Sequence, residues 1–297
     1  MYNLFLYAAS VLIWGSTWYA IEFQLGVVAV EVSLTYRFLI SAALAFAWCG
    51  LRRESVSFSW SIHRYFLLLG LFLFGLNYIA AYSAQIYITS ALNAIGFSTM
   101  VWMNILNARI FFGRPIEPRT YAGAGLGMTG IIALFWPEVR DISLQDGVFI
   151  GIGLSLLGAF LASLGNTVSL AVQQKKIPIM PTNAWGMLYG GLFNGGLALL
   201  QGRTFNFNTS PEYIISLLFL AIFGSLVAFA CYLTLLGKIG LERAGYIVVI
   251  IPVVALVISA LFEGLTLDLH ILIGITLALL GNILILGRQV IRKPIRI

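Results

Sequence analysis

The sequence predicts an all-α integral membrane protein with ten transmembrane helices, built as two inverted five-helix repeats. The first observation is composition: of 297 residues, 60% are hydrophobic and only 9% are charged, whereas soluble domains carry about 25% charged residues. The second is that apolar residues form runs of about 20, which as helices span a hydrocarbon core roughly 30 Å thick. The third is an internal repeat. The first two exclude a soluble enzyme, a nucleic-acid-binding protein and a disulfide-rich secreted domain.

Clusters of charged and turn-forming residues divide the chain into ten apolar segments joined by short loops. We expect spans at 4–21, 32–50, 65–84, 91–112, 120–136, 147–172, 182–201, 212–236, 244–262 and 271–288. Because lipid offers the backbone no hydrogen-bond partner, each span has to be a helix. No basic residue precedes the first apolar run, so we expect a retained helix and not a cleaved leader.

The placement of Lys and Arg predicts how the chain is oriented in the membrane. If the N-terminus is cytoplasmic, 13 basic residues fall in cytoplasmic loops or the tail, and only Arg140 and Arg203 fall outside. Cytoplasmic loops of membrane proteins carry such an excess. We therefore expect both termini in the cytoplasm and the protein in the inner membrane. The 13 residues are Arg52, Arg53, Arg64, Arg114, Arg119, Lys175, Lys176, Lys238, Arg243, Arg288, Arg292, Lys293 and Arg296.

A shift of 150 residues brings the second half of the chain over the first. Residues 93–113 then lie over 243–263, and one residue later Gly123 and Gly130 lie over Gly274 and Gly281. We expect one repeat at 1–146 and the other at 147–297. Each has five spans, an odd number, so the second enters the membrane from the opposite side. Inverted repeats with a substrate site between them are typical of secondary transporters.

Short motifs along the chain resemble those of one known family. They are Leu12-Ile13-Trp14-Gly15-Ser16-Thr17, Tyr36-Arg37-Phe38, Ala244-Gly245-Tyr246, Ile251-Pro252-Val253, Phe262-Glu263-Gly264 and Ile273-Gly274. Through them the whole chain resembles the ten-helix exporters of the EamA-like family, in the drug/metabolite transporter superfamily. The first repeat departs from the family pattern, with Trp102 at the usual proline and Gly113-Arg114 at the usual glutamate.

The resemblance implies a secondary transporter that exports small metabolites by alternating access. Within the superfamily, the aromatic content of the spans is most similar to exporters of aromatic amino acids. Amino acids, with aromatic ones favoured, are therefore the expected substrates. The alternatives are a drug, sugar or nucleotide-sugar carrier of the same superfamily, or a non-transporting structural membrane subunit.

Aromatic and uncharged polar side chains inside the spans are the candidate substrate-binding residues. A cavity walled by them suits an apolar or aromatic solute whose polar end is held by hydrogen bonds in place of salt bridges. We expect Trp185 to close this cavity, and we assign Trp18 to an interfacial belt. Helix packing is the alternative role for each aromatic. The candidate set is Trp14, Asn77, Tyr78, Tyr82, Trp102, Ser163, Asn166, Trp185 and Tyr189, with Pro252 as a gating hinge.

Ionisable residues inside the spans are scarce, and burying charge in lipid is costly. Glu22 and Arg37 lie near the outer face and could pair. No acidic residue lies deep in a span, so we expect no carboxylate relay for protons. Cys49 and Cys231 lie in apolar runs and are expected to be buried thiols.

Motifs for catalysis, ATP hydrolysis and metal binding are absent from the sequence: there is no HExxH, no GxSxG and no P-loop. We therefore expect a protein that is not an enzyme and has no cofactor and no bound metal. The expected partners are a small-molecule substrate and the lipid bilayer, without nucleic acid. Whether the protein also forms a homo-oligomer is left open.

Overall fold

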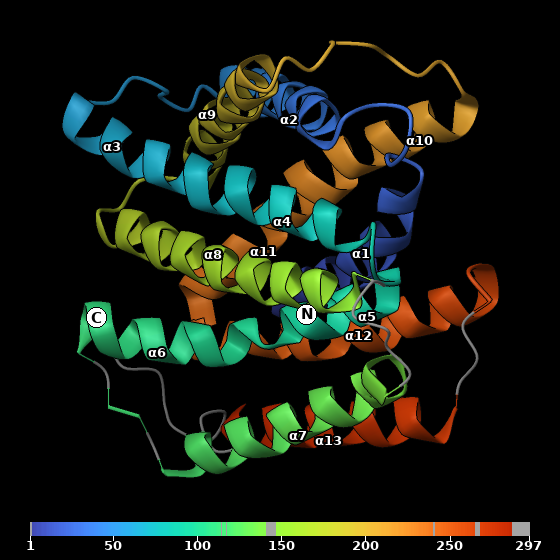
Figure 1. Ribbon diagram of the computed structural model, residues 1–297. Coiled ribbons are helices and arrows are strands. Elements are labelled where there is room, and N and C mark those ends of the chain that lie inside the picture. The colour runs from blue at the N-terminus through green and yellow to red at the C-terminus, as the bar shows by residue number, and fades with distance from the viewer. Residues whose placement is uncertain are drawn as a thin grey trace.

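The computed structural model describes residues 2–113, 115–116, 118–140, 147–239, 241–264 and 268–286. Within these residues all regular secondary structure is helical (Figure 1). The elements are α1 (Tyr2–Glu22), α2 (Val30–Arg52), α3 (Trp60–Leu69), η1 (Gly70–Leu76), α4 (Asn77–Ala84), α5 (Ser90–Ser98), α6 (Met100–Phe112), α7 (Pro118–Arg140), α8 (Val148–Gln174), α9 (Ile179–Leu200), α10 (Pro211–Phe219), η2 (Leu220–Val227), α11 (Ala228–Ile239), α12 (Leu241–Phe262) and α13 (Leu269–Leu286). These helices overlap the expected spans. The expected repeat boundary at 146/147 borders residues 141–146, which lie outside the described residues.

Length, hydropathy and surface all identify a membrane protein. Five helical segments of the described chain are long and apolar enough to cross a bilayer, with mean hydropathy between 1.4 and 2.6. Large apolar side chains also face outward, among them Leu4 and Ile110, each 71% exposed. Contiguous apolar surface of this kind favours lipid over water. The chain is a multi-pass membrane protein. The five segments are Tyr2–Glu22, Val30–Arg52, Trp60–Ala84, Val148–Gln174 and Pro211–Lys238.

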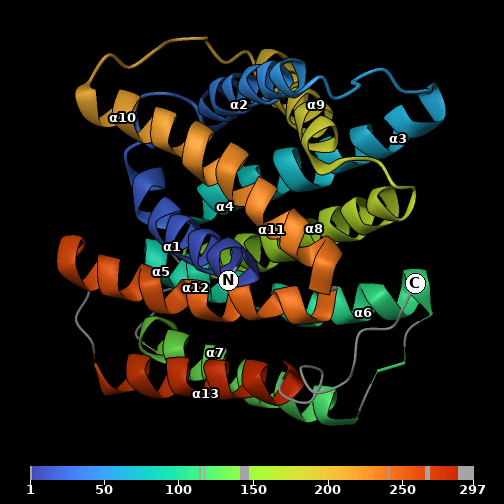
Figure 2. The same cartoon turned by 180° about the vertical axis from the view of Figure 1, so that it is seen from behind.

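Helices from the two halves of the chain pack on each other throughout the bundle (Figures 1 and 2). At one end of the molecule α2 crosses α9, and at the other α7 lies along α13. Between these pairs, α1 packs on α12 and α8 packs on α4, α5 and α6. The centre of the bundle is therefore an interface between residues 2–140 and residues 148–286.

Glycines allow the close approach of α7 and α13. A Cβ added at Gly130 would lie 2.5 Å from the backbone nitrogen of Ala278, and one added at Gly281 would lie 2.6 Å from that of Gly127. Non-bonded carbon and nitrogen atoms do not approach each other this closely, so only glycine fits at these two positions. Small residues allow helix backbones to touch in membranes, and these glycines thereby fix the pairing of the two helices.

Two of the long helices change to the wider π-helical form near their middle. The sequence predicts uninterrupted helices at 65–84 and 212–236, but η1 and η2 interrupt them, and their first residues are 150 positions apart. Side chains from neighbouring helices donate to carbonyl oxygens within these segments: Asn194 Nδ2 to Phe74 O at 3.2 Å and Ser41 Oγ to Ala221 O at 2.9 Å. Segments with π-helical turns are frequent at functional sites.

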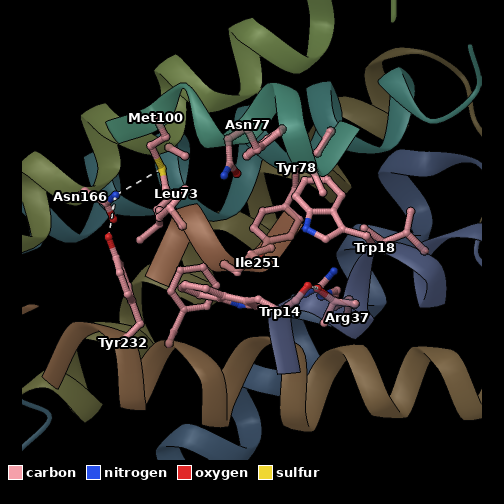
Figure 3. A pocket seen from close by; sticks show the side chains of 18 residues that line it. Trp14, Trp18, Arg37, Leu73, Asn77, Tyr78, Met100, Asn166, Tyr232 and Ile251 are labelled. Atoms are coloured by element: carbon pink, nitrogen blue, oxygen red, sulfur yellow. Dashed lines mark hydrogen bonds between the residues drawn. The ribbon is translucent and has the colours of Figure 1, made fainter. Parts of the chain in front are cut away.

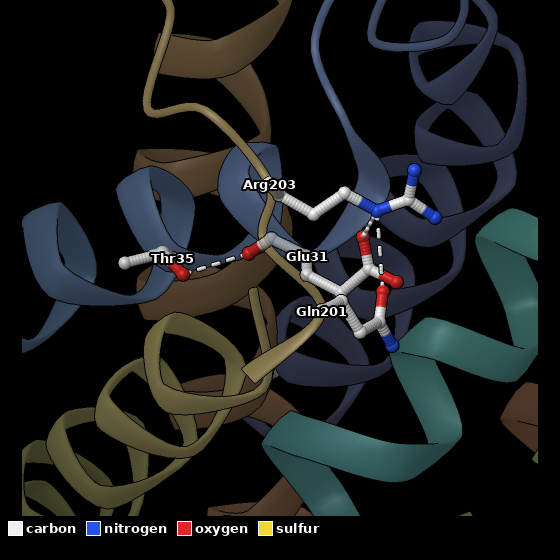
Figure 4. A network of polar contacts seen from close by, with 4 residues as sticks. All are labelled: Glu31, Thr35, Gln201 and Arg203. Atoms are coloured by element: carbon white, nitrogen blue, oxygen red, sulfur yellow. Dashed lines mark hydrogen bonds and ion pairs between the residues drawn. The ribbon is translucent and has the colours of Figure 1, made fainter. Parts of the chain in front are cut away.

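A polar contact ties the loop after α9 to the start of α2 (Figure 4). The Nε atom of Arg203 lies 4.0 Å from Glu31 Oε2 and donates to Gln201 Oε1 at 3.2 Å. The Arg203 side chain is 53% exposed. A solvated pair of this kind contributes at most about 1 kcal/mol, so it orients the loop more than it stabilises the fold.

Candidate substrate site

A cavity lies at the centre of the bundle, between the two halves of the chain (Figure 3). Its wall comes from α1, α2, η1, α4, α5, α6, α8, α11 and α12. The cavity volume is about 90 Å³, which is room for on the order of six water molecules. That is the scale of a single small solute. Six aromatic and four polar side chains line it, the others being aliphatic or Met: Trp14, Trp18, Tyr78, Phe97, Phe229, Tyr232, Thr17, Arg37, Asn77 and Asn166.

The indole of Trp14 forms one wall and is fixed on several sides. Its ring centroid lies 5.0 Å from that of Phe229 and 4.9 Å from that of Tyr232. Its Nε1 atom donates to the carbonyl oxygen of Gly224, within η2, at 3.0 Å. A half-buried indole whose N–H is hydrogen-bonded presents a fixed apolar face. The ring is thus a preformed surface for an apolar solute.

Arg37 brings the only charge among the described lining residues, and it is 1% exposed. Its Nε atom donates to Ser225 Oγ at 2.9 Å and its Nη1 atom to the Tyr82 hydroxyl at 2.9 Å. The guanidinium carbon lies 4.6 Å from the ring centroid of Tyr78. Two hydrogen bonds and an aromatic face therefore fix the orientation of the cation beside the cavity.

Amide groups form the remaining polar part of the wall (Figure 3). Asn166 Nδ2 donates to the Tyr232 hydroxyl at 3.3 Å and lies 3.5 Å from both Asn104 Oδ1 and Met100 Sδ. The Oδ1 atoms of Asn166 and Asn77 are buried and have no hydrogen-bond partner. Buried acceptors without partners are rare and invite a functional explanation.

Four of the residues predicted from the sequence line this cavity: Trp14, Asn77, Tyr78 and Asn166. Tyr82 lies directly behind its wall, where it accepts the hydrogen bond from Arg37. The expected i, i+4 relation of Tyr78 and Tyr82 places both rings on one side of α4, with centroids 6.5 Å apart.

The side chains of Trp102 and Ser163 face other helices. The Trp102 ring packs against Gly127 of α7, and its Nε1 atom is buried without a hydrogen-bond partner. The Ser163 hydroxyl accepts from Asn107 Nδ2 at 2.8 Å, which ties α8 to α6. Neither residue is among those that line the cavity. Depth along a helix is readable from sequence, whereas rotation about its axis depends on how the neighbours pack.

Trp185 and Tyr189 form a second aromatic cluster, with His63 at the start of α3. The two rings stack with centroids 5.6 Å apart, and the Tyr189 hydroxyl lies 2.8 Å from His63 Nδ1. Trp185 Nε1 donates to the carbonyl oxygen of Val56 at 2.9 Å. The structure therefore places Trp185 against the loop before α3, and it does not line the cavity that it was expected to close.

Pro252 is buried within α12 and is not one of the residues that line the cavity. Its neighbour Ile251 lines the cavity, as does Val248. Proline has no N–H to donate to the carbonyl four residues earlier, which here is that of Val248. The expected hinge position thus directly follows a residue of the cavity wall, and its hinge role stays a prediction.

The expected pairing of Glu22 with Arg37 is wrong. Among the described residues no carboxylate lies within ion-pair distance of Arg37. Glu22 accepts instead from Gln85 Nε2, and near it the Ser90 hydroxyl donates to Glu263 Oε2 at 2.7 Å. Each acid thus accepts from an uncharged donor, and neither pairs with Arg37.

Sequence reasoning missed several residues of the wall. Trp18, assigned to an interfacial belt, lines the cavity and meets Phe97 edge-on at 4.9 Å. Tyr232 carried a usable signal, because it lies 150 residues after Tyr82. Arg37 also carried one, as an ionisable residue inside a span.

The described residues offer no obvious metal centre. No group of three or more His, Cys, Asp or Glu side chains gathers within them. Cys49 and Cys231 are both free and buried, as expected for small apolar side chains within helices.

Together the fold and the cavity define a multi-pass membrane protein with an internal solute-sized chamber. The model of the EamA-like transporter family matches the chain twice, over residues 1–136 and 149–287. The chain belongs to the EamA-like transporter family, within the drug/metabolite transporter superfamily. Accordingly it is a transporter and not an enzyme.

The chain is also similar to two named relatives and to one solved structure. Protein PagO of Salmonella typhimurium is 21% identical over 93% of this chain and 90% of its own length. The uncharacterized transporter YoaV of Bacillus subtilis is 24% identical over 91% of each. One solved crystal structure, 17% identical, covers 95% of both chains with a TM-score of 0.72 and so shares the fold.

Proposed function

We propose that the protein is a secondary transporter that exports small metabolites across the inner membrane by alternating access, and that these are amino acids, with aromatic ones favoured. The observation that carries this proposal is the central cavity, where six aromatic side chains surround a few fixed polar groups. Apolar walls with few, well-placed polar groups are typical of small-molecule sites. The aromatic content of the spans adds a resemblance to the aromatic amino-acid exporter YddG.

Alternating access requires two halves that can rock against each other, and we propose inverted repeats at residues 1–146 and 147–297 with ten spans. The π-helices η1 and η2 begin 150 residues apart and occupy the third span of each half. The helix contacts are also symmetric between the halves. The first helix of the second half, α8, packs on η1 and α4 of the first half, and the first helix of the first half, α1, packs on η2 and α11 of the second. A cavity between the repeats is the usual place for the substrate.

The size of the cavity argues against the larger substrates of the superfamily. A nucleotide sugar has several times the volume of six waters, and its phosphates would call for several basic residues. Arg37 is the single basic residue among the described lining residues. A small solute with one anionic group fits this wall better than a diphosphate does.

Counterflow uptake tests the proposal directly. The purified full chain is reconstituted in proteoliposomes preloaded with unlabelled amino acid, and entry of radiolabelled phenylalanine, leucine and alanine is followed. We expect saturable entry that unlabelled phenylalanine and leucine suppress. Liposomes without protein give the background. Absence of counterflow for every amino acid tested would contradict the proposed substrate class, and absence for sugars and drugs as well would favour the structural-subunit alternative.

A further inference from the structure

We propose that the guanidinium of Arg37 is the anchor for a carboxylate of the transported solute, so that recognition depends on a carboxylate as well as on an apolar side chain. The inference rests on the proposed function for the kind of solute, and it adds the chemical group that the site requires. The sequence alone led us to expect neutral hydrogen bonds at the polar end of the substrate.

The charge of Arg37 has no partner of opposite sign in the described part of the chain. The side chain is 1% exposed, and its hydrogen bonds go to two neutral hydroxyl groups, those of Ser225 and Tyr82. An isolated buried charge within a membrane span is costly, and such residues usually mark substrate pathways. The contrast is Arg203, whose guanidinium lies beside Glu31 at the surface (Figure 4).

The geometry leaves one face of the guanidinium available. Nε and Nη1 are engaged, whereas Nη2 has no hydrogen-bond partner among the described residues. Gly224 packs closely against Nη2: a Cβ added there would approach it to 3.2 Å, so a larger residue at this position would crowd the guanidinium. Arg37 also lines the cavity, next to Trp14 (Figure 3). Arginine donors favour planar carboxylates, because charge-assisted hydrogen bonds are the strong ones.

The amide oxygens of the wall complement an amino group on the same solute. The Oδ1 atoms of Asn77 and Asn166 lack hydrogen-bond partners, and both residues line the cavity. No Asp or Glu is among the described lining residues. The site thus offers a cation for a carboxylate but only neutral acceptors for an ammonium group. Carboxylate recognition should therefore dominate, and the amino group should contribute less.

Three compounds with one carbon skeleton separate these groups: L-leucine, 4-methylpentanoate, which lacks the amino group, and 3-methylbutylamine, which lacks the carboxylate. Ligand-induced thermal stabilisation of the purified full chain is measured against concentration. We expect both carboxylates to stabilise the wild-type protein and the amine not to. In Arg37→Gln the half-saturating concentration of the carboxylates should rise by roughly tenfold or more, the loss of one charge-assisted hydrogen bond.

Two further variants complete the test. Arg37→Lys keeps the positive charge but loses the planar array of guanidinium N–H donors, so it should keep the preference for carboxylates at reduced affinity. Arg203→Gln removes a surface arginine and should match the wild type. Where Arg37→Gln fails to fold, the three compounds on the wild type and on Arg37→Lys still decide.

Three results would contradict the proposed role of Arg37: the amine stabilises the protein as much as the acids do, neither acid stabilises it, or folded Arg37→Gln responds to the carboxylates as the wild type does. These outcomes are distinct from failure of the proposed function. If no amino acid enters in counterflow but carboxylates still stabilise the protein in a way that depends on Arg37, the proposed amino-acid transport is wrong and the proposed carboxylate binding by Arg37 is supported.

Discussion

Trp14 and Trp102 are both half-buried indoles on helices, yet their surroundings give them different roles. Trp14 lines the cavity and contacts Phe229 and Tyr232 there. Trp102 packs against Gly127 on the far side of its helix. One ring is placed to touch a solute, and the other joins two helices.

We therefore expect opposite signatures for Trp14→Ala and Trp102→Ala. Loss of the Trp14 ring should weaken transport of phenylalanine more than that of alanine, by roughly twofold to tenfold, because an aromatic pair contributes about 0.5–1.5 kcal/mol. Trp102→Ala should destabilise the fold by about 3–5 kcal/mol and reduce both fluxes in proportion to the folded fraction. Flux normalised to folded protein is the measurement. Selective loss of phenylalanine transport in Trp102→Ala, and not in Trp14→Ala, would reverse the assignment.

The sequence predicted the kind of side chain that lines the candidate site, but only some of the residues themselves. An aromatic residue such as Tyr78, well inside a span, is poorly explained by an interfacial belt, and it lines the cavity. Trp185 lies only three residues from the start of its expected span, 182–201, and its ring packs against His63. The difference depends on helix rotation, which is set by packing partners that lie more than a hundred residues away in sequence.

The pairing of α7 with α13 tests how far single glycines determine the bundle. Gly130 faces the backbone of α13, where a Cβ would lie 2.5 Å from Ala278 N, whereas a Cβ at Gly125 on the same helix meets nothing within 4 Å. Gly130→Ala should lower the melting temperature by several degrees, since the backbones must separate. Gly125→Ala should be neutral or stabilising by up to about 1 kcal/mol, the usual gain of alanine over glycine in a helix.

Thermal unfolding of the two alanine variants in the same detergent measures this difference. Equal melting temperatures for the two would mean that α7 and α13 are not in close contact in the folded protein.

Element bounds were predictable because apolar length and charged loops mark them. The interruptions were not. Nothing in the apolar run around Gly70 or Leu220 distinguishes a π-helical turn from an α-helical one. The signal lies in donors on other helices, such as Asn194, whose side chain reaches Phe74 O. A single-sequence reading cannot see these tertiary partners.

At the scale of the whole molecule, the polar groups of the cavity bear on how transport is driven. No carboxylate is among the described lining residues, and Glu22, the last residue of α1, accepts a hydrogen bond from Gln85. We expect no obligatory proton relay, so Glu22→Gln should retain counterflow within about twofold, because the glutamine side chain keeps an oxygen that can accept from Gln85. Counterflow with and without an imposed proton gradient is the measurement. Gradient-driven accumulation that Glu22→Gln abolishes would contradict this.

Orientation in the membrane can be checked at two exposed loop positions. The excess of Lys and Arg predicts that Ser57 lies on the cytoplasmic side and Thr209 outside, and both residues are exposed. Asp141, in another loop expected outside, lies beyond the described residues. In a background without Cys49 and Cys231, a membrane-impermeant thiol reagent applied to cells should label Thr209→Cys and spare Ser57→Cys. The reverse pattern would invert the topology.

The π-helix η1 has a consequence for which side chains face the solute. Each α-helical residue advances the chain by a fixed angle, 3.6 residues to the turn, and a π-helical stretch advances it by less. Every residue beyond Leu76 is therefore out of phase with a helical wheel drawn from Trp60. Asn77 and Tyr78, the first residues of α4, reach the cavity in this shifted phase. The π-helical turns therefore rotate α4 relative to α3, and this rotation determines which α4 side chains face the transported molecule.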